Sequence, residues 1–333
     1  LPTVNLIPNA VHEMPLRHLA VREGITGPVA VGVDHYYEPP ISWDLVDVLA
    51  RTVAAARAAA ERVVWAPELM SGIWRTPGEQ VAYPDPDPLE QAAWWGVAMA
   101  LGYQGFDLYM LANRENWQFA PISEEGELTD FSAPVRRLAR LLAAEPDLTR
   151  ARPLNRVSVL WHRPDALAAY TTVGTMRQPT VPWADPSKRQ AYDAHTALCR
   201  RLLQDGHGYE LWDPAVAGRP PVGAVVLVPE PTGVSEHALA AALSAGCQVL
   251  RVRPNAAVLP TPAPAVRLEL KDGLDGFAAL HATDEGRHFL HVAQWGTSRP
   301  RPDARIVRVE TGLLPSPAAG QWVDVLSREA LPN

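Results

Sequence analysis

One acidic residue, Glu68, occupies a position typical of a catalytic carboxylate. A short apolar run, residues 63–66, is followed by Pro67 and Glu68, and small and aromatic residues come next. This pattern is expected where a buried strand opens into a functional loop. Glu68 is therefore the first candidate for a catalytic residue. The alternative is a carboxylate that only forms an ion pair or a cap after the strand.

Strand-like and helix-like segments alternate around Glu68. Strands are predicted at residues 1–7, 27–37, 63–68 and 105–111, and helices at residues 14–23, 41–62, 89–101 and 133–144. Alternation of this kind builds parallel α/β folds, and in barrels the chemistry lies at the carboxyl ends of the strands. A TIM barrel needs eight strands, and this segment supplies four. Residues 1–148 are therefore expected to form the C-terminal half of a TIM-barrel domain, and the chain is expected to be a fragment.

Polar and aromatic side chains follow the predicted strands. The candidates for substrate contacts are Asn5, Asp34, Tyr36, Trp74, Asn113 and Trp117. Indole faces pack well on the C–H groups of sugar rings, and the polar groups can bond to hydroxyls. Residues 34–37 could instead form a packed aromatic corner. Three other tryptophans, Trp65, Trp94 and Trp95, lie inside a strand or a helix and are expected in the core.

Two further domains are predicted after a proline-containing linker at residues 146–153. Strands at residues 156–161, 209–212, 224–229 and 247–252 alternate with helices at residues 187–204 and 235–245. This order predicts a flavodoxin-like, doubly wound α/β domain over residues 153–260. Short alternating runs separated by Gly, Asp and Pro then predict a small β domain over residues 261–333.

Composition restricts the partners. The net charge is −7 and no long basic run occurs, so neither nucleic acid nor an anionic membrane is expected as a partner. No apolar run reaches the roughly 18 residues of a membrane span, and no signal peptide is recognisable. Cys199 and Cys247 have no metal-ligand spacing. We expect a cytoplasmic protein with no metal and no cofactor.

Three sequence blocks resemble β-galactosidases of glycoside hydrolase families 35 and 42. They are PELMSGIW at residues 67–74, the segment at residues 96–117, and APISEEGEL at residues 120–128. The resemblance implies a retaining glycosidase, in which one carboxylate attacks the anomeric carbon and a second protonates the leaving oxygen. Glu68 matches the family's nucleophile. The family's acid belongs to an Asn-Glu pair on an earlier strand, and no Asn-Glu pair precedes Glu68 here; Glu13 and Glu38 lack that context.

Residues 153–260 resemble the glutamine-amidotransferase-like domain that follows the barrel in family 42. The resemblance implies a homo-oligomer formed through this domain, and a carbohydrate as the substrate. We expect a β-galactosidase-type enzyme that cleaves terminal β-galactosides, inactive as this fragment because the acid is missing. The alternative is a non-catalytic carbohydrate-binding or oligomerisation module.

Amidotransferase chemistry is a third possibility for residues 155–255. Cys247 precedes an apolar run, whereas the nucleophilic cysteine of an amidotransferase follows one, and the Gly-x-Cys-x-Gly elbow is absent. We therefore expect Cys247 to be a buried structural thiol.

Overall fold

The computed structural model describes residues 3–6, 30–37, 39–59, 63–75, 84–162, 164–165, 186–214, 220, 224–270, 274–296 and 306–311. The helix expected at residues 14–23 lies outside them, as do Glu13 and Glu38. Contacts divide the chain into two compact units. The first contains Leu1–Asp34, Trp43–Trp65 and Leu154–Pro264, and the second contains His35–Ser42, Ala66–Pro153 and Ala265–Asn333.

The strand that carries Glu68 belongs to a four-stranded sheet with the order β1-β2-β3-β5. Its strands are β1 (Thr3–Leu6), β2 (Ala30–Val33), β3 (Val63–Met70) and β5 (Gly105–Tyr109). β1 pairs with β2, and β2 with β3, in parallel. Helix α2 (Trp43–Ala59) connects β2 to β3, and α3 (Pro88–Leu101) connects β3 to β5. The predicted α/β class with parallel strands is confirmed, and the arrangement is consistent with part of a TIM barrel.

Helix α3 has clear signals at both ends. The Asp87 side chain accepts a hydrogen bond from the Leu89 N–H at 2.7 Å, and the helix ends at Gly102, whose φ is 114°. Trp94 and Trp95 are 0% and 2% exposed. Their predicted place in the core is confirmed.

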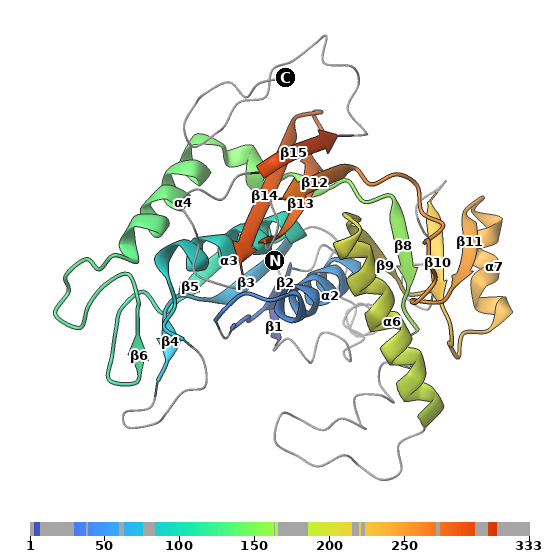
Figure 1. The fold of residues 1–333 in the computed structure, drawn as a ribbon, viewed down its shortest axis with the longest axis horizontal. Coiled ribbons are helices and arrows are strands. Elements are labelled where there is room, and N and C mark those ends of the chain that lie inside the picture. Colours follow the sequence, from blue (N-terminus) through green and yellow to red (C-terminus); the bar gives the residue numbers. More distant parts are fainter. Residues whose placement is uncertain are drawn as a thin grey trace. The chain divides into compact units, whose positions relative to one another are not determined.

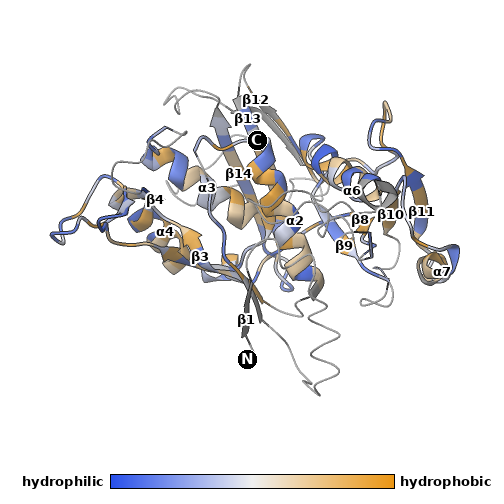
Figure 2. Ribbon diagram, turned by 90° about the horizontal axis from the view of Figure 1, so that it is seen from below, coloured by the Kyte–Doolittle hydropathy of each residue, from blue (hydrophilic) through white to orange (hydrophobic). Residues whose placement is uncertain are grey.

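Helix α4 (Ser132–Ala144) packs one face against the core of the second unit. Leu138 and Leu141 of α4 contact a buried cluster that includes Met99 and Phe289. Hydrophobic and hydrophilic residues share the helix in Figure 2, the pattern of an amphipathic helix. The residues expected to form a linker instead contain a 3-10 helix, η1 (Pro146–Thr149), and a short strand, β7 (Arg152–Pro153).

The last part of the chain is a set of antiparallel strands in the second unit. β14 (His288–Gly296) pairs with β13 (Leu274–Ala282), β13 also pairs with β7, and β12 (Val266–Leu270) pairs with β15 (Ile306–Thr311). The sequence did not predict β13, because Gly276 and the pair Ala278-Ala279 are disfavoured in strands. A Cβ at Gly276 would lie 2.9 Å from the Ala293 carbonyl oxygen, so this strand needs a glycine where the strands approach closely.

A second parallel sheet, in the first unit, has the order β11-β10-β8-β9. It contains β8 (Val157–Leu160), β9 (Tyr209–Trp212), β10 (Val225–Pro229) and β11 (Gln248–Val252). Helices α6 (Pro186–Gln204) and α7 (Glu236–Ser244) flank it on opposite sides (Figure 1). Cys247 is 6% exposed and belongs to the apolar core of this sheet, as expected for a structural thiol.

None of the helices in the described parts of the chain is both long and apolar enough to cross a membrane. The sequence-based domain boundaries near residues 148–153 and 260 stay predictions.

Candidate active site

Glu68 lies near the carboxyl end of β3 and is half-buried. The segment that follows β2 runs alongside it. The His35 N–H donates to the Glu68 carbonyl oxygen at 2.8 Å, and the Met70 N–H donates to the His35 carbonyl oxygen at 3.0 Å. These bonds continue the strand pairing past the end of β2. The backbone on both sides of the Glu68 side chain is therefore fixed.

The Tyr36 hydroxyl donates a hydrogen bond to Oε2 of Glu68. Tyr36 is 41% exposed, so the carboxylate and the phenol meet near the surface. The ring of Tyr36 meets the rings of Tyr109 and Trp117 edge to face, with centroids 6.1 and 6.3 Å apart. Packing thus holds the phenol, and the phenol orients the carboxylate.

Two short strands bring the tryptophans to the same place. β4 (Ile73–Trp74) pairs with β6 (Trp117–Gln118), with Trp74 opposite Trp117. Trp117 is buried, and its indole N–H donates to the Ser71 carbonyl oxygen at 2.8 Å. Trp74 is 48% exposed and lies edge to face with Trp117, with centroids 6.2 Å apart. Ring contacts through Trp117 and Tyr36 connect Trp74 to Glu68, and an exposed indole is a suitable platform for a sugar ring.

Tyr36, Trp74 and Trp117 form an aromatic wall next to Glu68. Two residues that were not predicted from the sequence complete this wall. The Tyr109 ring lies 5.3 Å from that of Trp117, at the end of β5. The Arg114 guanidinium lies 5.9 Å from the Trp74 ring centroid and donates to the Tyr109 hydroxyl at 3.3 Å. Tyr109 lies inside the strand predicted at residues 105–111, and Arg114 lies among the polar residues that follow it. Neither position distinguished these two residues from their neighbours.

The predicted substrate contacts differ in where the structure places them. Tyr36 contacts Glu68, Trp117 packs against Tyr36, and Trp74 packs against Trp117. Asn5 on β1 and Asp34 after β2 belong to the first unit. The Asn113 side-chain oxygen accepts a hydrogen bond from the Ala120 N–H at 2.7 Å and stabilises its own loop. A role in sugar binding for Asn5, Asp34 and Asn113 stays a prediction.

His35, next to Tyr36, has a structural role. It is 2% exposed and stacks on Trp94 with centroids 5.4 Å apart. Burial lowers the pKa of His35 to about 3, so the ring is neutral at physiological pH. Its packing explains how the strand end that carries Tyr36 is held.

The chemistry available around Glu68 is that of an oriented carboxylate beside aromatic rings. A carboxylate can attack an electrophilic carbon or stabilise a positive charge that develops there. The rings of Tyr36, Trp74 and Tyr109 offer apolar surface, and Arg114 adds a positive charge at the rim.

Neither a protein-family model nor a curated protein matches the sequence. Solved structures do match. The β-galactosidase of the Antarctic haloarchaeon Halorubrum lacusprofundi has a TM-score of 0.50 and 16% identity, over 89% of this chain and 52% of that chain. The β-galactosidase of the psychrophilic Marinomonas ef1 has a TM-score of 0.48 and 10% identity, over 80% and 49%. That of Bacillus circulans sp. alkalophilus has a TM-score of 0.47 and 13% identity, over 68% and 31%.

The chain therefore spans about half the length, or less, of the solved structures that it matches. At these identities the likeness concerns the fold alone, and the first of the three supports it. Over the part that it spans, the fold of this chain is similar to that of a solved β-galactosidase.

Proposed function

We propose that this chain carries the nucleophile of a retaining glycoside hydrolase that cleaves terminal β-galactosides. The observation that supports the proposal most directly is the hydrogen bond from Tyr36 to the Glu68 carboxylate, inside an aromatic wall at the end of a parallel strand. In this proposal Glu68 attacks the anomeric carbon and forms a covalent glycosyl-enzyme intermediate.

Each neighbour of Glu68 has a definite part in the proposed reaction. Tyr36 holds one carboxylate oxygen, which leaves the other to attack the sugar. Trp74 presents an exposed apolar face to the ring while the anomeric carbon gains positive charge, and the buried Trp117 supports it edge to face. The second residue of the reaction, the acid that protonates the leaving oxygen, is not assigned, because no Asn-Glu pair precedes Glu68. The first step can therefore be tested alone with a leaving group that departs without a proton.

The test is covalent labelling by an activated fluorogalactoside whose dinitrophenolate leaves unprotonated. We expect mass spectrometry to find one fluorogalactosyl group on the peptide that contains Glu68, and none on Glu68→Gln. Tyr36→Phe should label at least about tenfold more slowly, since the carboxylate loses its orienting hydrogen bond. Glu115→Gln, which changes an exposed glutamate in the loop before Trp117, should label like the unchanged protein. Labelling of Glu68→Gln at the same rate would exclude Glu68 as the nucleophile.

The alternative is a module that binds carbohydrate without cleaving it. The exposed rings of Trp74 and Tyr36 favour this alternative, since they can bind a sugar whether or not Glu68 reacts. Saturable binding of galactose with no labelling of Glu68 would support it over the enzyme.

Self-association through residues 153–260 is a separate part of the proposal. Two large apolar side chains are exposed there, Leu243 at 58% and Val258 at 80%. If they lie in an interface, Leu243→Glu and Val258→Glu should raise the dissociation constant at least about tenfold, because each would bury a charge. Sedimentation velocity measures this, with the exposed His237→Glu on α7 as control. A monomer at all concentrations in the unchanged chain would contradict the proposal.

A further inference from the structure

A cavity lies in the first unit at the point where the order of the second parallel sheet reverses. From β8 the chain passes through α6 to β9 on one side, and it then returns to β10 on the other side. Open parallel sheets bind their ligands outside the carboxyl ends of the strands at such a switch point. The cavity occupies this place, lined by Trp161 and His162 just after β8 and by Thr232 just after β10.

The size of the cavity limits what it can hold. Counted out to its open mouth it has a volume of about 360 Å³, but the centre of a water-sized group can occupy only about 20 Å³ of it. The inner space is enough for about one water-sized group. A ligand would therefore place one small polar group inside and keep the rest of its atoms at the mouth.

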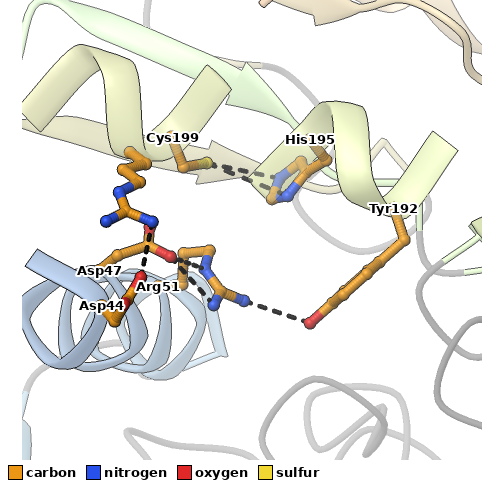
Figure 3. Close-up of polar contacts among 7 residues, drawn as sticks. Asp44, Asp47, Arg51, Tyr192, His195 and Cys199 are labelled. Atoms are coloured by element: carbon orange, nitrogen blue, oxygen red, sulfur yellow. Dashed lines mark hydrogen bonds and ion pairs between the residues drawn. The ribbon is translucent and has the colours of Figure 1, made fainter. Parts of the chain in front are cut away.

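The cation that faces the cavity is already neutralised. Arg51 of α2 is 7% exposed, and its Nε and Nη2 atoms each lie 3.2 Å from Oδ2 of Asp47 (Figure 3). Its Nη1 donates to the Tyr192 hydroxyl at 3.2 Å. Because Asp47 balances the charge of Arg51, the guanidinium acts on the cavity as a hydrogen-bond donor more than as a net charge.

The anion that faces the cavity is also satisfied. Oδ2 of Asp165 accepts hydrogen bonds from the Gly233 N–H at 2.8 Å and from the Thr232 hydroxyl at 3.2 Å. Nδ1 of His162 lies 2.8 Å from the same oxygen. A free cation at this oxygen would thus have to compete with two hydrogen bonds and with the nearby imidazole.

The remaining polar groups are neutral. Burial lowers the pKa of His195 to about 3, and the ring lies edge to face with Trp161, with centroids 5.6 Å apart. Its neighbour Cys199 is also buried, which raises the pKa of the thiol, so no thiolate is available beside His195. The pair therefore lacks the nucleophile that acyl-transfer chemistry requires, and the cavity is suited to binding.

We propose that this cavity binds the hydroxyl-bearing end of a small neutral polyol or sugar. Arg51, Tyr192, His195 and Thr232 surround it with both donors and acceptors, and Trp161, Leu160 and Pro229 supply an apolar wall. A hydroxyl both donates and accepts, so it matches this set, whereas an ion finds no unbalanced charge. The site is separate from Glu68 and does not depend on the proposed hydrolase function.

The test uses the full chain labelled with fluorotryptophan and observed by fluorine NMR. Trp161→Phe identifies the Trp161 signal and Trp74→Phe the Trp74 signal. We expect glycerol or D-galactose to shift the Trp161 signal saturably and sodium acetate to leave it in place. His162→Ala, which removes a polar side chain from the lining of the cavity, should weaken the response about fivefold, the effect of one hydrogen bond. His237→Ala, which removes an exposed histidine from α7, should not change it.

Several outcomes would overturn the proposal. A shift of the Trp161 signal by acetate would exclude a polyol site. No shift with either neutral probe would exclude it as well, and so would equal responses in His162→Ala and His237→Ala. Galactose that shifts only the Trp74 signal would do the same while supporting sugar binding beside Glu68. A shift of the Trp161 signal alone would leave the cavity proposal standing even if Glu68 never reacts.

Discussion

Gly72→Ala is expected to lower the free energy of unfolding by at least about 3 kcal/mol. Gly72 has φ 82°, a conformation that disfavours any side chain. A Cβ there would also lie 2.6 Å from the Gln118 carbonyl oxygen and 2.7 Å from the Trp117 indole nitrogen. The first of these neighbours is backbone, so β6 would have to move away from β4.

Gly126→Ala is the matched control for this substitution. Gly126 has φ 89°, but a Cβ there would meet no atom within 4 Å. It should cost about 1 kcal/mol, from the backbone conformation alone. Urea unfolding of the unchanged chain and the two variants at one pH separates the cost of backbone strain from the cost of steric overlap. If the two variants lost the same free energy of unfolding, the close approach of β6 to Gly72 would contribute nothing to the cost of the substitution.

The Gly72 substitution also connects stability with the candidate site. The Trp117 indole donates to the Ser71 carbonyl oxygen, next to Gly72, and it packs against Tyr36. If β6 moves, the ring that supports the phenol on Glu68 moves with it. Labelling of Glu68 should therefore slow in Gly72→Ala even where the protein is still folded, and it should be unchanged in Gly126→Ala.

The sequence predicted the parts of the site that follow strands. Glu68, Tyr36 and Trp74 each lie within a few residues of a strand end, where a local pattern can indicate them. The hydrogen bond between Tyr36 and Glu68 joins residues 32 positions apart, and no local pattern encodes such a pairing. For that reason Tyr36 was predicted to contact the sugar, whereas the structure places its hydroxyl on Glu68.

Strand β13 and the cavity at the switch point could not be predicted from the sequence, because both depend on tertiary contacts. Strand β13 contains Gly276, which weakens a strand on its own, but its pairing with β14 on one side and β7 on the other stabilises it. The cavity at the switch point needs Arg51 of α2 beside Trp161 and Thr232, which lie more than 100 residues further along the chain. The sequence predicted both the sheet that forms this point and the helix at residues 41–62, but not that this helix would place Arg51 at the cavity.

Acid is expected to destabilise the protein through its buried histidines, and His35 provides the clearest test. The pKa of His35 is about 3 in the folded protein because of burial, against an ordinary value of 6.5. Between pH 6.5 and 3, His35 therefore binds a proton in the unfolded chain but not in the folded chain. The stability that His35 supplies is full above pH 6.5 and is lost as the pH falls towards 3, by about 1.4 kcal/mol per pH unit.

His35→Phe should remove this dependence while it keeps the stacking on Trp94. Between pH 6.5 and 5 the unchanged chain should lose about 2 kcal/mol more than the variant, measured by urea unfolding at each pH. Burial also lowers the pKa values of His195 and His291, to about 3 and 4, and these residues remain in both proteins. Their contributions cancel in the comparison, so the difference in slope belongs to His35. Parallel stability curves for the two proteins would show that His35 accepts its proton in the folded state as readily as in the unfolded chain.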